Sequence, residues 1–244
     1  MVKVKTVSFK RTDYDLPPFM LEAVKKIADH FSVKRDKRYL NEFRLVFKRS
    51  KHWNPEKGAL KQQLEEWKAQ FTRNYSDRNK LANIIVDSFH CCKTKDEINK
   101  LRGALLEAFL IGVKGGFNGI DSREEMARGW GARVYLQNSK QGVLYNCLEH
   151  KYEGCTSRST VDYGEWDGCH GQFYECKVSP VSIRCKEVKY MEHLKKELSS
   201  QSISHEVFFL CADSKLNVQI KLEEYGLGPL YKPLGIEDIH EMYA

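Results

Sequence analysis

The amino-acid sequence predicts an α/β protein in which a mostly helical N-terminal domain precedes a second domain that combines strands and helices. Apolar residues recur at helical spacing through the first 95 residues, and after Gly115-Gly116 they recur at alternate positions, which is typical of strands. From residue 94 onwards the expected order is helix, strands, turn, strand, helix, strand. We therefore expect a helical domain over residues 1–93 and an α/β domain over residues 94–244.

Three helices are predicted in the first domain. The first follows Pro17-Pro18 over residues 19–31, and the others cover residues 56–75 and 77–91, with Asp77 as the N-cap of the last. A basic stretch over residues 34–49 and a break at Trp53-Asn54-Pro55 lie between the first two helices.

A fourth helix is predicted over residues 96–113. Thr94 and Glu97 have the spacing of a capping box, and Gly115-Gly116 ends the helix. Glu107 lies among apolar residues of this helix, so it either borders solvent or faces a polar site.

Strands are expected over residues 133–137, 143–148, 159–163, 172–178 and 206–211. The third is expected to end at Gly164, and a turn over residues 167–171 separates it from the fourth. Helices are expected over residues 185–200 and 236–242. The last strand is apolar throughout, as expected for a buried strand.

Composition excludes several classes of protein. The 244 residues include 12 Phe, 12 Tyr and 4 Trp, too many aromatic residues for a wholly disordered chain. Only 6 Pro and 16 Gly argue against a fibrous protein. Because no window approaches 18 apolar residues and the first residues lack the apolar core of a signal peptide, we expect a cytoplasmic protein with no membrane partner.

The net charge of +7 is unevenly distributed along the chain. Residues 1–95 contain 22 Lys and Arg against 11 Asp and Glu, whereas residues 96–244 contain 18 against 22. A basic first part is typical of a protein that grips a polyanion, although a solvated helical surface is the alternative. The candidate nucleic-acid-binding residues are Lys34, Arg35, Lys37, Arg38, Arg44, Lys48, Arg49 and Lys51. Tyr39, Phe43, Phe47 and Trp53 lie among them and would either stack on bases or form the helical core.

The eight cysteines are expected to be reduced thiols that serve as small apolar residues. No CxxC pair occurs. The spacing of Cys169, His170, Cys176 and Cys185 does not match a zinc finger.

Two carboxylates and a lysine are predicted to converge on neighbouring strands. Glu175 and Lys177 are two residues apart, so they share one face of a strand. The preceding turn brings Asp162 near that face. Converging carboxylates repel each other unless a cation holds them, and a site rich in oxygen ligands suits Mg²⁺ or Mn²⁺. A nearby lysine can orient or help deprotonate an attacking water.

This pattern resembles the PD-(D/E)XK, or restriction-endonuclease-like, nuclease superfamily over about residues 94–212. Asp162 is followed after thirteen positions by Glu175, then Cys176 and Lys177, and a helix that carries Glu107 precedes the strands. The resemblance implies a restriction-endonuclease-like core, which is a mixed central sheet flanked by helices. It also implies that Asp162, Glu175 and the Cys176 carbonyl bind the metal, that Glu107 holds a metal water or a second metal, and that Lys177 serves the nucleophilic water.

Two features leave alternatives open. Val161 rather than proline precedes Asp162, a departure that the family tolerates, and Asp167 would replace Asp162 if the hairpin were shorter. His170 and Gln172 flank the turn, where a surface role competes with a catalytic one.

The expected function is therefore metal-dependent phosphodiester hydrolysis by an endonuclease of the restriction or phage-defence type. DNA is the expected partner, with RNA as the alternative, and cutting both strands would require a homodimer. A non-catalytic nucleic-acid-binding protein that retains the nuclease fold is the second hypothesis. An interaction module for an acidic protein is the third.

Overall fold

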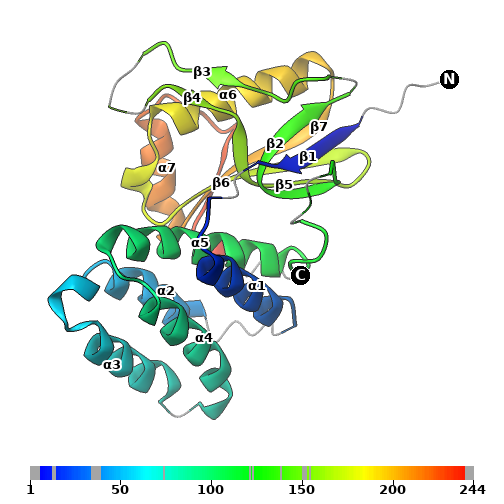
Figure 1. Ribbon diagram of the computed structural model, residues 1–244. Coiled ribbons are helices and arrows are strands. Elements are labelled where there is room, and N and C mark those ends of the chain that lie inside the picture. The colour runs from blue at the N-terminus through cyan, green and yellow to red at the C-terminus, as the bar shows by residue number, and fades with distance from the viewer. Residues whose placement is uncertain are drawn as a thin grey trace. The chain divides into compact units, whose positions relative to one another are not determined.

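The computed structural model describes residues 6–12, 15–33, 40–73, 75–120, 122, 124–137, 139–149, 153 and 155–239, without the side chains of residues 41, 42 and 57 (Figure 1). The chain forms two compact units. The sheet unit consists of Met1–Tyr14 and Asn118–Gly235, and the helical unit consists of Asp15–Phe117 and Ile236–Ala244.

The sheet unit contains a six-stranded sheet in the order β1-β2-β5-β6-β7-β8. Its strands are β1 (Val7–Arg11), β2 (Arg128–Leu136), β5 (Thr160–Trp166), β6 (His170–Lys177), β7 (Ser204–Cys211) and β8 (Lys232–Leu234). The first four are antiparallel neighbours, whereas β6, β7 and β8 are parallel. The parallel pairs need long connections, and α6 (Cys185–Ser200) and α7 (Lys215–Glu223) supply them.

Helices α6 and α7 share one apolar core with the sheet (Figure 1). Met191 and Leu194 of α6 belong to the same buried cluster as Phe173 of β6 and Phe209 of β7. A small second sheet pairs β3 (Tyr145–Asn146) with β4 (Ser157–Arg158), and a 3-10 turn, η4 (Pro180–Ser182), precedes α6.

The helical unit contains α1 (Pro18–Val33), α2 (Leu40–Ser50), α3 (Leu60–Thr72), α4 (Asn79–His90) and α5 (Lys95–Val113), with 3-10 turns η2 (Pro55–Lys57) and η3 (Ser76–Arg78). The predicted capping box at the start of α5 is confirmed, because Thr94 accepts the Glu97 N–H and Glu97 accepts the Thr94 N–H. Phe31, Phe43 and Phe109 pack together with ring centroids 4.7 to 5.5 Å apart.

The structure confirms an α/β protein with a mixed central sheet flanked by helices. Several elements differ from the expectation. Strands β1 and β8 and helix α7 were not predicted, because short strands and a weakly amphipathic helix give little periodicity. Gly164 lies inside β5 rather than at its end. A side chain at this position would collide with the Phe9 ring, which explains why a glycine occurs within the strand.

The start of α4 and the boundary between the two units also differ from the expectation. Asp77 lies within η3, and α4 begins after Arg78 without a side-chain cap. The expected division between residues 93 and 94 falls inside the helical unit, which includes α5. Of the helix expected over residues 236–242, residues 240–242 lie outside the described residues.

Candidate functional site

The side chains of Asp162, Glu175 and Lys177 lie together on β5 and β6. The register pairs Tyr163 with Tyr174, so Asp162 and Glu175 each lie one residue further along on the other face. Lys177 Nζ is 3.5 Å from Asp162 Oδ2 and donates a hydrogen bond to Glu175 Oε1. The Cys176 N–H donates to Asp162 Oδ2 at 2.7 Å. Antiparallel pairing of two strands thus places both carboxylates and the lysine at one point.

Arg158 of β4 contacts both carboxylates and was not anticipated from the sequence. Its Nη2 lies 3.0 Å from Asp162 Oδ1 and 2.6 Å from Glu175 Oε2, and its Nη1 lies 3.7 Å from Glu187 Oε1 on α6. The requirement that buried carboxylates have counterions indicated that a further cation was needed. Arg158 precedes Asp162 by four residues and Glu175 by 17, and this spacing alone does not show that one guanidinium group reaches both carboxylates.

Burial and opposite charges set the protonation of this cluster. Burial raises the pKa of Glu175 to about 7 against the opposing charge of Arg158. Burial alone would also raise the pKa of Asp162, but Lys177, Arg158 and the Cys176 N–H together lower it. Burial would lower the pKa of Lys177, but Asp162 and Glu175 raise it, so its ammonium group stays charged.

Asp167 lies in the turn between β5 and β6, apart from the carboxylate cluster. Its Oδ1 accepts the Cys169 N–H at 2.8 Å and the His170 N–H at 2.6 Å. These two backbone bonds lower the pKa of Asp167 to about 2. The geometry therefore assigns Asp162, rather than Asp167, to the cluster with Glu175.

His170 and Gln172 contact β7 rather than the carboxylates of the candidate site. His170 Nδ1 is 2.8 Å from Ser204 Oγ, and its Nε2 is 3.5 Å from Glu206. Gln172 Nε2 is 3.4 Å from Glu206 and its Oε1 accepts the Tyr174 hydroxyl. Both residues thus link β6 to β7, and a catalytic role for either stays a prediction.

Glu107 lies on α5, in the helical unit, and its side chain is partly buried. The other candidate site residues belong to the sheet unit. A role for Glu107 in the same site stays a prediction.

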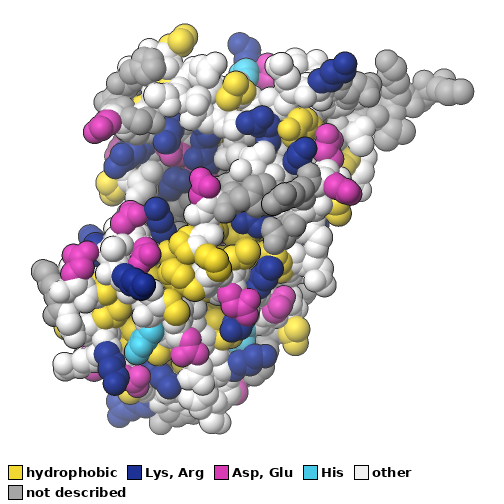
Figure 2. Space-filling model, in the orientation of Figure 1, with side chains coloured by type: hydrophobic (Ala, Val, Ile, Leu, Met, Phe, Trp, Pro, Cys, Tyr) yellow, Lys and Arg dark blue, Asp and Glu magenta, His cyan; other side chains and the backbone are white. Residues whose placement is uncertain are grey.

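The predicted nucleic-acid-binding stretch is described only in part. Lys34, Arg35, Lys37, Arg38 and Tyr39 lie outside the described residues. Arg44, Lys48 and Arg49 lie on α2, and Lys48 and the following Lys51 are exposed. Phe43, Phe47 and Trp53 are at most 3% exposed, so they form helical core and cannot stack on bases. On the face shown in Figure 2, basic and acidic side chains are intermixed over the helices.

Two pockets in the described part of the chain lie away from the carboxylate cluster. One of about 410 Å³ is lined by α7 and β8, and one of about 640 Å³ is lined by α1 and α4. None of Asp162, Glu175 and Lys177 lines either pocket. Among the described helices, none is long and apolar enough to cross a bilayer.

No protein-family model matches the chain, and no curated protein matches it either. A solved structure of protein VC1899 from Vibrio cholerae resembles it with a TM-score of 0.38 and 11% sequence identity. The match covers 98% of this chain and 57% of that one, so this chain spans little more than half of that protein. A likeness this weak carries no argument about fold family or function.

Proposed function

We propose that the protein is a metal-dependent endonuclease that hydrolyses phosphodiester bonds in DNA, of the restriction or phage-defence type, with a restriction-endonuclease-like core. The observation that carries the proposal is the convergence of Asp162, Glu175 and Lys177 on adjacent strands. These are the residues that resemble the PD-(D/E)XK pattern. The order α5, β2, β5, β6, α6, β7 also agrees with the order that the resemblance implies.

The donor set fits a small divalent cation. One nitrogen of Arg158 lies within hydrogen-bonding distance of an oxygen of each carboxylate, so a positive group already fits between them. Asp162, Glu175 and the Cys176 carbonyl offer oxygen ligands, which Mg²⁺ and Mn²⁺ prefer. A bound Mg²⁺ would supply a water nucleophile and neutralise charge on the phosphate. By the same resemblance, Glu107 would hold a metal water or a second metal.

The residues of the chain would have separate tasks. Asp162 and Glu175 would hold the cation, and the Cys176 N–H fixes the Asp162 carboxylate in place. Lys177 is held as an ammonium group between the two carboxylates, which favours charge stabilisation and water orientation over proton abstraction. Arg158 would have to move or share the carboxylates when the cation binds.

A second candidate is a nucleic-acid-binding protein with this fold and no catalysis. The observation that favours it is the same Arg158 contact, because Arg158 and Lys177 already neutralise Asp162 and Glu175 without a metal. In that case the cluster would be a buried salt-bridge network.

Cleavage of supercoiled plasmid DNA and of labelled RNA, with and without Mg²⁺ or Mn²⁺, tests the proposal. We expect metal-dependent DNA cleavage that falls on the order of 100-fold or more in Asp162→Asn, Glu175→Gln and Lys177→Ala. Glu107→Gln should reduce cleavage less. Asp167→Asn is the matched control, because Asp167 is on the same hairpin but outside the cluster, and it should cleave normally.

Full activity in all three variants of the cluster would exclude this site. Salt-sensitive DNA binding without cleavage under either metal would establish the second candidate instead. Circular dichroism of each variant ensures that a loss of cleavage does not reflect unfolding.

A further inference from the structure

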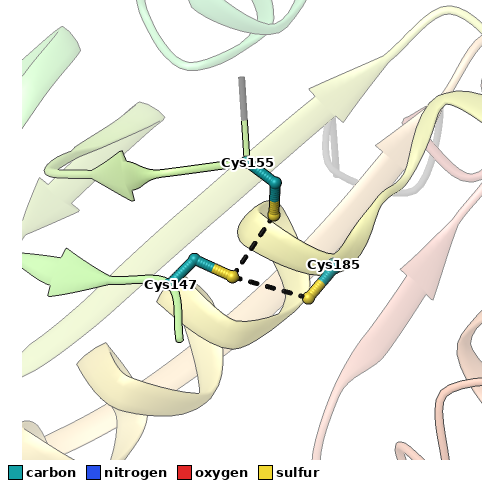
Figure 3. Close-up of side chains that lie close together, drawn as sticks. All are labelled: Cys147, Cys155 and Cys185. Atoms are coloured by element: carbon teal, nitrogen blue, oxygen red, sulfur yellow. Dashed lines mark hydrogen bonds between the residues drawn. The ribbon is translucent and has the colours of Figure 1, made fainter. Parts of the chain in front are cut away.

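Three cysteines far apart in the sequence bring their sulfur atoms together in the sheet unit (Figure 3). Cys147 follows β3, Cys155 precedes β4, and Cys185 is the first residue of α6. Cys147 Sγ is 3.3 Å from Cys155 Sγ and 3.9 Å from Cys185 Sγ, and all three sulfurs lie within 4.8 Å of one another. None is in a disulfide, and each is at most 3% exposed.

The arrangement differs from that of thiols used as apolar filling. Cys211 is part of the main core of the sheet unit, among large apolar side chains. By contrast, Cys147, Cys155 and Cys185 form a cluster of their own, and Tyr145 is the partly buried hydrophobic residue packed against it. These three thiols therefore lie apart from the main apolar core of the sheet unit and beside one another.

We propose that Cys147, Cys155 and Cys185 bind a structural Zn²⁺ ion as thiolates, with the carboxylate of Glu149 as the fourth ligand. Zinc bonds to sulfur at about 2.3 Å in a tetrahedron, which separates two sulfur ligands by about 3.8 Å. The two distances from Cys147 Sγ, 3.3 Å to Cys155 Sγ and 3.9 Å to Cys185 Sγ, lie on either side of that value. Thiolate-rich tetrahedral sites select zinc over magnesium and calcium.

The fourth ligand is assigned from the segment that follows Cys147. Glu149 Oε2 lies 3.7 Å from Cys185 Sγ. Among the described residues, the ligand atoms that lie within 4.8 Å of one another are the three sulfurs, so the carboxylate would have to move closer to Cys147 and Cys155 when the ion binds. The next residue in the sequence, His150, is outside the described residues and is the rival ligand to be tested.

The site would hold together two elements that are weak alone. Strands β3 and β4 have two residues each, and a pair this short is not stable by itself. Zinc would fasten both strands to the first turn of α6 at one end of the pair, where Cys147 follows β3 and Cys155 precedes β4. Because β4 carries Arg158 and α6 carries Glu187, the ion would also fix the Arg158 guanidinium beside Asp162 and Glu175.

Metal analysis of the reduced full-length protein tests the proposal without any assay of cleavage. Inductively coupled plasma mass spectrometry should find one zinc per chain. Replacement by Co²⁺ should give the visible absorption of a tetrahedral ion and thiolate charge-transfer bands. Cys147→Ala, Cys155→Ala and Cys185→Ala should each lose the metal, whereas Cys92→Ala, at an equally buried thiol outside the cluster, should retain it.

Thiol titration of the wild-type protein covers the case in which those variants fail to fold. Removing the zinc with a chelator should make three further thiols reactive, and adding zinc should protect them again. Glu149→Gln should weaken zinc binding, and His150→Ala should not. The reverse result would overturn Glu149 as the fourth ligand.

Two results would overturn the whole proposal. One is a reduced protein that contains no zinc and gives no tetrahedral cobalt spectrum. The other is a disulfide-linked peptide containing Cys147 and Cys155 in protein purified under non-oxidising conditions. Neither result depends on whether the protein cleaves DNA, so this proposal and the nuclease proposal fail separately.

Discussion

At the scale of single residues, the counterions decide what the carboxylate pair can do. Glu175 is 1% exposed, so its charge is costly to bury unless a cation compensates it. Arg158 and Lys177 both lie within bonding distance. A divalent ion would compete with Arg158 for the same oxygens, and this competition can be measured.

Arg158→Ala should destabilise the protein by about 3–5 kcal/mol, because it leaves buried carboxylates without their partner. If the carboxylates bind a divalent ion, Mg²⁺ or Mn²⁺ should raise the melting temperature of this variant more than that of the wild type. Thermal unfolding at increasing metal concentration checks this. An equal effect of metal on both proteins would count against a cation site here.

The Asp167 carboxylate gives a test of pH dependence outside the carboxylate cluster. Because the folded-state pKa of about 2 is below the ordinary value of 3.8, Asp167 stabilises the fold fully above pH 3.8. That contribution is lost as the pH falls through about 2. The melting temperature of Asp167→Ala should therefore lie below that of the wild type by a constant amount at neutral pH, and the gap should close on acidification.

Asp167→Asn is the control for this measurement, because asparagine retains an acceptor without a titrating group. The gap between the Asn and Ala variants should not vary with pH. If the difference in melting temperature between the wild type and Asp167→Ala stayed the same in acid, that result would contradict the two backbone hydrogen bonds of Asp167.

At the scale of elements, α1 and α5 pack closely because Gly112 has no side chain. A Cβ atom at Gly112 would lie 2.7 Å from the carbonyl oxygen of Ala28 and 2.7 Å from the Cβ of Phe31. Gly103, on the same helix, has no atom within 4 Å of that position. Substitution of Gly103 by alanine therefore tests helix propensity alone, whereas the same substitution at Gly112 also tests the packing of α5 against α1.

Gly112→Ala should lower the free energy of unfolding, because overpacking costs about 1–3 kcal/mol and exceeds the gain in helix propensity of about 1 kcal/mol. Gly103→Ala should raise it by about 0.5–1 kcal/mol. Urea unfolding followed by circular dichroism measures both. Two changes of the same sign would show that α1 and α5 do not pack as described.

At the scale of the whole molecule, the two structural units differ less in net charge than the first 95 residues differ from the rest of the chain. The helical unit contains 21 Lys and Arg against 16 Asp and Glu, and the sheet unit contains 19 against 17, so their net charges are +5 and +2. The first 14 residues are basic but belong to the sheet unit, whereas α5 and the acidic C-terminal residues belong to the helical unit. The proposed binding of nucleic acid by the helical unit would therefore have to depend on local clusters of basic residues.

The exposed residues Lys48 and Lys51 provide a test of such a cluster. The double variant Lys48→Glu/Lys51→Glu should bind DNA more weakly, and its dependence on salt should fall by about 0.9 in logarithmic slope for each phosphate that the variant no longer neutralises. Fluorescence anisotropy at several salt concentrations measures the slope. Lys61→Glu, at an exposed lysine of α3, should leave the slope unchanged. An unchanged slope in the double variant would remove α2 from the DNA-binding surface.

The sequence by itself determined the features that depend on neighbouring residues. The capping box at Thr94 and Glu97, the helix over 185–200 and the convergence of Asp162, Glu175 and Lys177 all follow from local spacing. A short hairpin fixes its own register, and alternation along a strand fixes which side chains share a face. Their chemical roles remain predictions.

Only the tertiary structure decided which distant residues complete these features. Arg158 reaches Glu175 from the small second sheet, and Cys147, Cys155 and Cys185 meet because both strands of that sheet contact α6. Likewise β1 joins the sheet beside β2, although more than one hundred residues separate them. Such contacts depend on how the elements pack against one another, and local spacing in the sequence does not predict that packing. Packing therefore brings together cationic side chains and sulfur atoms that are far apart in the sequence.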